Sequence, residues 1–237
     1  MMSDAFFSNV YTKKLWAGHQ FDLHGGSGTG SIPEVAFVTR YAIGHIVVKY
    51  NIKNILDAAC GAMKWQTPLM RQIKKDIPWP IDYVGVDIVD DLVEHHQHIL
   101  FDIGRFYKCD ITLDPLPKGV DLVICRDVLF HFSLPKIVEA LRNILASGAK
   151  YLLTTSFDSK TIAFSMDFNM ACNNINFHEP PFSFGHLAIE SWDERLELFG
   201  ISGGRHLLLF DLDNLRSLDW SAIELRAKNA HRHSRGK

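Results

Sequence analysis

Three aspartates lie at the ends of short apolar segments that are typical of buried strands: Asp57, Asp87 and Asp110. In an open α/β sheet, ligands bind beyond the carboxyl ends of the strands, so these carboxylates are candidate ligand contacts. Asp87 can accept the hydroxyl hydrogens of a ribose or cap the helix that follows, and Asp110 can meet an adenine amino group or belong to a turn. Three like charges at one sheet edge repel each other, which favours a shared ligand.

The turn after Asp57, AACGA (58–62), consists of small residues that let a ligand approach the backbone closely. Its one glycine, Gly61, falls short of the three spaced glycines of a dinucleotide-binding turn, and the Lys-Ser/Thr ending of a phosphate-binding loop is absent. The acid beside this turn therefore indicates a ligand that carries positive charge and no phosphate.

A possible acid–base pair follows the fourth apolar segment, where Asp127 and His131 are four residues apart. If this stretch is helical, the two side chains share one face. A histidine oriented by a carboxylate is a plausible general base for a hydroxyl nucleophile. His131 could instead be a core or capping histidine, and which of the two residues would take the proton is left open.

Segments rich in Val, Ile and Leu alternate with segments of helical character between residues 32 and 157. We expect strands at 53–58, 82–88, 105–110, 120–127 and 149–157, and helices at 32–50, 64–76, 90–102 and 134–148. This alternation predicts a parallel sheet covered on both faces. Two more strands, at 195–200 and 205–212, predict an antiparallel hairpin that closes the sheet.

The totals are those of an ordinary globular protein: 237 residues with a formal net charge of −2, which gives no overall attraction to nucleic acid. We expect one domain over 1–237, with a possible lid or substrate-binding insertion at 158–190. The absence of a signal peptide, of a membrane-spanning stretch and of paired cysteine spacing predicts a cytoplasmic protein with free thiols. The basic tail (226–237) is expected to be frayed.

Four segments, in order and spacing, resemble the motifs of class I S-adenosylmethionine-dependent methyltransferases: NILDAACGAMKW, YVGVDI, FYKCDIT and DLVICRDVLFHFS. The resemblance covers residues 53–157. It implies a doubly wound, Rossmann-like α/β fold with a seven-stranded sheet, mostly parallel with a C-terminal antiparallel hairpin, and S-adenosylmethionine as cofactor. One departure is that Ala59 and Ala62 occupy places that usually hold glycine.

The same resemblance implies cofactor contacts along the strand ends. These would serve the amino-acid part, the ribose and the adenine in turn: Asp57, Ala59 and Gly61; Asp87 and Ile88; Asp110 and Ile111. Arg126 would lie beside the methionine moiety. The SGTGS segment, part of a cofactor-covering segment and helix at residues 1–50, would fold over the cofactor, and Gly28 and Gly30 would allow close approach. Trp65 would form a wall of the pocket or pack in the core.

A narrower resemblance rests on SGTGS, Trp65, CRDVLFHFS, KYLLTTSF and NINFHEPPF. These segments are similar to a little-characterised group of bacterial and viral methyltransferases that often accompany glycan-synthesis enzymes. The likeness implies O-methylation of a sugar hydroxyl, with Asn176 and His178 near the substrate, although His178 could be a surface residue. The alternatives are a small-metabolite or protein methyltransferase and a non-catalytic binding module.

A metal site is not expected. The segment EHHQH (94–98) places at most two histidines on one helix face, which favours a solvated helix surface. Several phenylalanines of the 158–190 segment suit either stacking on a sugar ring or packing of the segment itself: Phe164, Phe168, Phe177, Phe182 and Phe184.

Overall fold

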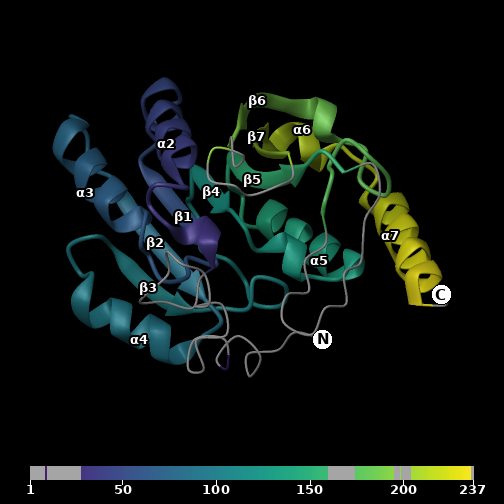
Figure 1. The fold of residues 1–237 in the computed structure, drawn as a ribbon, viewed down its shortest axis with the longest axis horizontal. Helices are drawn as coiled ribbons and strands as arrows, with labels where there is room; N and C mark the ends of the chain where they lie inside the picture. The colour runs from purple at the N-terminus through teal and green to yellow at the C-terminus, as the bar shows by residue number, and fades with distance from the viewer. Residues whose placement is uncertain (1–8, 10–27, 160–173, 195–197, 199–203, 236–237) are drawn as a thin grey trace. The chain divides into compact units, whose positions relative to one another are not determined.

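The computed structural model describes residues 9, 28–159, 174–194, 198 and 204–235 (Figure 1). Its seven strands have the order β3-β2-β1-β4-β5-β7-β6. All described pairings up to β5 are parallel, and those of β7 are antiparallel, so the expected fold class is confirmed. By compactness the chain divides into two units, residues 2–110 and residues 111–237.

The first unit, residues 2–110, has three parallel strands: β1 (Asn54–Ala58), β2 (Asp82–Asp87) and β3 (Arg105–Lys108). Its helices are α2 (Phe37–Lys49), α3 (Gln66–Asp76) and α4 (Asp90–Ile99), preceded by the short 3-10 helix η1 (Thr29–Ser31). Asp57 pairs with Gly85 and Asp87 pairs with Lys108, so the carboxyl ends of the three strands lie along one edge.

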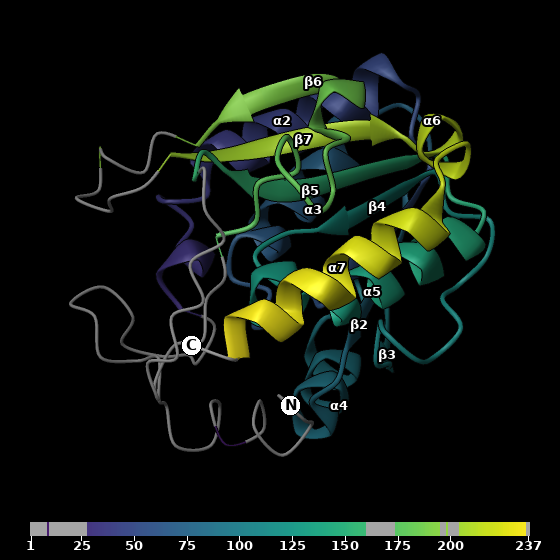
Figure 2. The ribbon, with the colours of Figure 1, turned by 90° about the vertical axis from the view of Figure 1, so that its right-hand side faces the viewer.

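The second unit, residues 111–237, contains β4 (Leu122–Cys125) and β5 (Tyr151–Phe157) in parallel. β7 (Arg205–Asp211) runs antiparallel between β5 and β6 (Ala188–Asp193). The helices are α5 (Leu134–Ala146), α6 (Leu212–Arg216) and α7 (Trp220–Arg235), with the 3-10 helices η2 (Leu129–His131) and η3 (Gly185–Leu187). α5 and α7 lie side by side (Figure 2), and Arg142 pairs with Glu224 between them.

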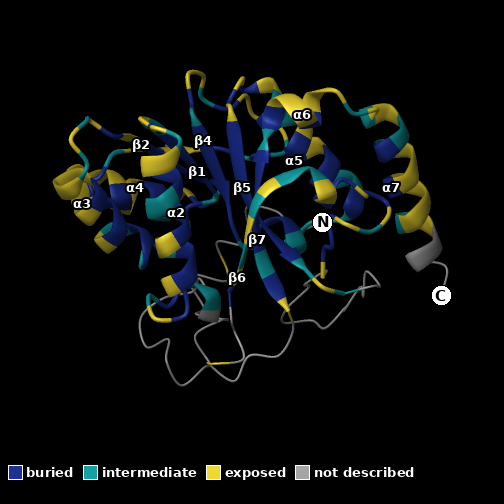
Figure 3. Cartoon of the chain, turned by 90° about the horizontal axis from the view of Figure 1, so that it is seen from above, coloured by how far each residue is buried: buried dark blue, intermediate teal, exposed yellow. Residues whose placement is uncertain are grey.

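The interior is apolar, as the strand patterns predict. β1, β4 and β5 are buried along almost their whole length (Figure 3), because their Val, Ile and Leu side chains are covered on both faces. Three of the four cysteines, Cys60, Cys109 and Cys125, are buried free thiols, as expected. Cys172 lies outside the described residues. Among the described helices, none combines the length and hydrophobicity of a membrane span.

The expected hairpin is present, but its first strand lies earlier in the chain. β6 is Ala188–Asp193 and not 195–200, most of which lies outside the described residues. The side chains of β6 alternate between half-buried and exposed because it is an edge strand, so it lacks a continuous apolar run. Residues 188–190, expected to end the 158–190 insertion, therefore belong to the sheet.

The expectation of a frayed basic tail is wrong, because α7 continues to Arg235. Ile223 and Ala227, four residues apart, are buried on one face of this helix, and Glu224 pairs with Lys228 on the outside. The buried apolar face consists of these two residues in an otherwise polar stretch. For that reason the sequence pattern favours a frayed tail over a packed helix.

The phenylalanines of the 158–190 segment that the structure describes are core residues. Phe177, Phe182 and Phe184 are at most 2% exposed, and their rings lie within 5.1–6.0 Å of one another. Phe184 also packs edge-on against Phe210 of β7. These rings stabilise the described part of the segment and are not free to stack on a sugar. Phe164 and Phe168 lie outside the described residues.

Candidate active site

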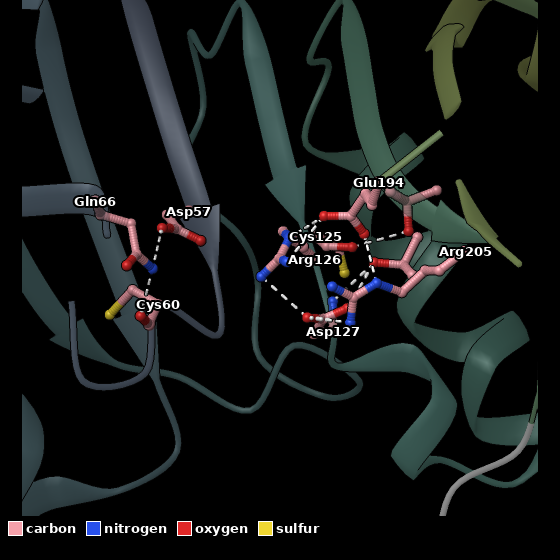
Figure 4. A network of polar contacts seen from close by, with 10 residues as sticks. Asp57, Cys60, Gln66, Cys125, Arg126, Asp127, Glu194 and Arg205 are labelled. Atoms are coloured by element: carbon pink, nitrogen blue, oxygen red, sulfur yellow. Dashed lines mark hydrogen bonds and ion pairs between the residues drawn. The ribbon is translucent and has the colours of Figure 1, made fainter. Parts of the chain in front are cut away.

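Asp57, at the end of β1, is 2% exposed and is held by Tyr83 and by Gln66, of which Figure 4 shows Gln66. Its Oδ2 accepts hydrogen bonds from Tyr83 Oη at 2.7 Å and from Gln66 Nε2 at 3.1 Å. Burial, followed by the charge of Asp57, raises the pKa of Tyr83 well above its ordinary value, so the phenol stays a donor. Gln66 also donates to the carbonyl of Cys60 at 2.7 Å. The carboxylate is thus tied to the turn that follows it.

That turn has an unusual backbone. Ala59, Gly61 and Met63 have φ values of 68°, 57° and 57°, a left-handed region that favours glycine. Non-glycine residues pay about 1–2 kcal/mol each for this conformation. Ala59 therefore occupies a glycine-type position, and the expected similarity to a glycine-rich turn holds for its backbone there. Ala62 is not among the positive-φ residues of the described chain.

Asp87, at the end of β2, is 6% exposed and accepts hydrogen bonds from the backbone of two loops. Its Oδ2 accepts the amide of Gly61 at 2.9 Å, and its Oδ1 accepts that of Val89 at 3.1 Å, just before α4. Burial raises the pKa of Asp87, although these amides and that of Ile88 lower it. Asp87 therefore holds the turn before α4 but is not its N-cap residue, which is Val89, so the capping alternative is wrong in that respect. Because a carboxylate has about four acceptor positions, it still has capacity for a ligand hydroxyl.

The other first-unit residues expected at the cofactor follow β3, begin α3 or surround η1. Asp110 is half-buried, two residues beyond β3, and the amide of Cys109 donates to the carbonyl of Asp87 at 2.9 Å. Trp65 is 3% exposed at the start of α3. Gly28, at φ 72°, and Gly30 are half-buried around η1.

In the second unit, the end of β4 carries a buried ion network (Figure 4). The carboxylate of Glu194, which is 0% exposed, forms ion pairs with Arg126 Nη2 at 2.9 Å and with Arg205 Nε at 2.6 Å. Asp127 Oδ2 lies 2.9 Å from Arg126 Nη1 and 3.0 Å from Arg205 Nη1. Two cations and two anions alternate, so the network is neutral. Glu194 and Arg205 are site residues that the sequence analysis missed.

Asp127 is held in one orientation. Its φ is 57°, its amide donates to Thr155 Oγ1 at 3.0 Å, and Thr155 Oγ1 donates to its Oδ1 at 3.1 Å. Burial raises the pKa of Asp127, but Arg126 and Arg205 more than offset this effect, and His131 lowers the pKa further. The carboxylate stays ionised and takes up protons poorly.

His131 does not share an α-helix with Asp127, so the helical premise for that pair is wrong. The chain turns at Asp127 and forms a 3-10 turn over Leu129–His131. His131 is half-buried, and its ring centroid lies 4.3 Å from that of Phe130. Phe130, also half-buried, packs edge-on against Phe157 at 5.7 Å. One half-buried aromatic ring, that of Phe130, thus lies against the histidine, and a second, that of Phe157, lies behind the first.

The remaining second-unit residues are placed as follows. Ile111 is buried just after Asp110. Asn176, 7% exposed, donates to the carbonyl of Ser159 at 3.2 Å and accepts the amide of His178 at 2.9 Å, while His178 itself is exposed. In the described part of the chain, no group of three His, Cys, Asp or Glu side chains could hold a metal ion.

Comparison with protein families gives a match over residues 56–153 to the family described as "Methyltransferase domain". This segment runs from the end of β1 to β5, and it includes Asp57, the turn, Asp87, Asp127 and His131. Comparison with curated proteins finds no match.

Among solved structures, magnesium protoporphyrin IX methyltransferase of Synechocystis PCC 6803 with bound S-adenosylhomocysteine is similar, at 16% identity and a TM-score of 0.56. The match covers 88% of this chain and 94% of that one. The O-methyltransferase of a Brevibacillus brevis polyketide synthase, with the same ligand, has 14% identity and a TM-score of 0.53, over 80% of this chain and 76% of that one. At these identities the likeness establishes the fold alone.

The match to the methyltransferase domain spans residues 56–153, and the seven-stranded sheet has the fold of the similar methyltransferase structures. The chain is an S-adenosylmethionine-dependent methyltransferase, with S-adenosylmethionine as its cofactor. The first unit fits such a molecule, because buried carboxylates and a turn without a phosphate-binding pattern suit a cationic, hydroxyl-bearing nucleoside.

Proposed function

We propose that the enzyme methylates a hydroxyl oxygen of a sugar, in a glycan or a glycan precursor. His131 carries the proposal, since it lies within the electrostatic influence of the ionised Asp127 and beside the half-buried ring of Phe130, which in turn packs against the half-buried ring of Phe157. A histidine supplies a base and aromatic faces suit the apolar side of a sugar ring. An O-methyltransferase among the solved structures of the same fold is consistent with oxygen as the acceptor atom.

We propose that the first unit holds the cofactor with residues expected from the sequence. Asp87, with Ile88 beside it, would bind the ribose hydroxyls through its remaining acceptor capacity. Asp57, with Ala59 and Gly61 of the turn, would face the amino-acid part, and Asp110 would face the adenine. The buried position of Asp57 and Asp87 supports this assignment, because water competes little with a ligand there.

Further cofactor contacts are proposed on the resemblance alone: Gly28, Gly30, Trp65, Ile111 and Arg126. Arg126 would act through its backbone, because its side chain is engaged by Glu194 and Asp127. Asn176 and His178 are proposed substrate contacts. A cytoplasmic location and an association with glycan-synthesis enzymes belong to the same proposal; the free thiols suit the reducing location.

The bound cofactor supplies a methyl group activated by a positively charged sulfur. His131 accepts the proton that the acceptor hydroxyl loses as its oxygen becomes methylated. Asp127 is the poorer base, since its pKa is lowered, and its negative charge stabilises the imidazolium that forms on His131. Arg126 and Arg205 fix the position of that carboxylate.

Replacing the histidine tests its role. In His131→Ala, we expect turnover to fall by about 100-fold or more, the usual range for a general base, while S-adenosylmethionine affinity stays near the wild-type value. Initial rates at saturating cofactor and calorimetric Kd values measure the two effects. His186→Ala, at an exposed histidine of the same unit, is the control. Full activity in His131→Ala would remove this residue as the base.

The acceptor is tested with cofactor carrying a labelled methyl group and a panel of oligosaccharides, small hydroxylated metabolites and proteins. Label in a sugar, at an oxygen identified by mass spectrometry, supports the proposal. Label only in a small metabolite or a protein side chain would contradict the sugar acceptor and leave the enzyme class unchanged.

A further inference from the structure

Both backbone groups of Gly61 are held by side chains from the second strand and the helix after it. The Gly61 amide donates to Asp87 Oδ2 at 2.9 Å. The Gly61 carbonyl lies 2.7 Å from Nε2 of His96, which belongs to α4. A carbonyl only accepts, so the short contact fixes the proton of His96 on Nε2. The only glycine of the turn is therefore clamped from both sides.

The turn needs such a clamp. Two of its three left-handed residues, Ala59 and Met63, are not glycines, and a strained backbone persists only where its surroundings over-determine it. Gln66 holds the Cys60 carbonyl, Asp87 holds the Gly61 amide and His96 holds the Gly61 carbonyl. Side chains thus fix a shape that a glycine-rich turn would adopt without strain.

His96 is a polar side chain in a buried position where an apolar residue would be expected. It is 2% exposed, and its ring lies 5.2 Å from that of Phe106. Its Nδ1 is buried without a hydrogen-bond partner, which costs free energy that an apolar side chain would avoid. Burial lowers its pKa, and its charged or titratable contacts among the described residues are limited to His95, so the ring is neutral at pH 7. The bond to Gly61 is the gain that offsets this cost.

We infer that His96 is a positioning residue for cofactor binding. It holds the 59–63 turn in the conformation in which Gly61, Asp57 and Asp87 receive S-adenosylmethionine. Its contribution is transmitted through the Gly61 carbonyl and requires no contact with the cofactor. The inference rests on the cofactor contacts proposed for this turn.

Two variants separate the hydrogen bond from the packing. His96→Leu keeps an apolar volume but removes the donor, and His96→Gln places an amide donor near the position of Nε2. His98→Gln, at an exposed histidine of α4, is the matched control. We would titrate the full chain with S-adenosylmethionine by calorimetry and record the melting temperature of each protein.

We expect His96→Leu to bind S-adenosylmethionine at least about tenfold more weakly, and His96→Gln and His98→Gln to bind it within about threefold of wild type. A folded His96→Leu with wild-type Kd would overturn the inference, and so would a folded His96→Gln that binds tenfold more weakly. If His96→Leu fails to fold, His96→Gln decides alone. Absence of binding by wild type would instead contradict the proposed cofactor site.

Discussion

Glu194→Gln is expected to lower the free energy of unfolding by about 3–5 kcal/mol, which is the usual cost of breaking a buried ion pair by removing one partner. Glu194 is fully buried and contacts both Arg126 and Arg205. Without its charge, two buried guanidinium groups share the single carboxylate of Asp127. Urea unfolding of wild type and variant, followed by circular dichroism, measures the difference.

Glu224→Gln is the matched control for this prediction. Glu224 also contacts two cations, Arg142 and Lys228, but its side chain is 30% exposed, whereas that of Glu194 is 0% exposed, so its loss should change stability little. Equal and small changes in both variants would show that the buried network contributes no more than a surface ion pair. A decrease of several kcal/mol in Glu194→Gln alone would support its role in holding Arg126 and Arg205, the two cations that pair with Asp127.

Asp87→Ala is expected to weaken S-adenosylmethionine binding by at least about 100-fold. A hydrogen bond to a charged acceptor contributes about 1.5–3 kcal/mol, and each 1.4 kcal/mol is a factor of ten in Kd. The change removes the proposed ribose contact and also releases the Gly61 amide. Calorimetry gives the Kd, and the melting temperature shows that the variant is folded.

Two observations would contradict this role of Asp87. One is wild-type affinity in folded Asp87→Ala, and the other is an equal loss in Asp91→Asn, an exposed acid in the first turn of α4.

The pH dependence of cofactor binding has a definite sign. Because burial raises the pKa of Asp87, the carboxylate is protonated at higher pH than an ordinary aspartate, and wild-type affinity should fall as pH drops through that raised pKa.

The sheet of residues 53–157 could be predicted from the sequence because its signals are local. Short segments that contain Val, Ile or Leu mark β1, β4 and β5, and the alternation with helices implies parallel order. The same pattern predicts that Asp57 and Asp87 lie at the carboxyl ends of β1 and β2. The position of β6 and the extent of α7 could not be predicted, because few of their residues are buried and their sequences are largely polar.

The site residues that the sequence analysis missed depend on contacts between distant parts of the chain. Glu194 lies 68 positions from Arg126, and His96 lies 35 positions from Gly61, so no spacing rule connects them. The EHHQH pattern instead favours a solvated helix surface for His96. The helical relation of Asp127 to His131 fails for a local reason, because the positive φ of Asp127 turns the chain out of the helix that a four-residue spacing would need.

The most direct test of the central claim is a calorimetric titration of the wild-type chain with S-adenosylmethionine, together with its melting temperature at saturation. We expect one site per chain and a clear rise in melting temperature, since ligand at 100 times Kd stabilises a folded protein by about 2.7 kcal/mol. No heat and no change in melting temperature at millimolar cofactor would contradict it.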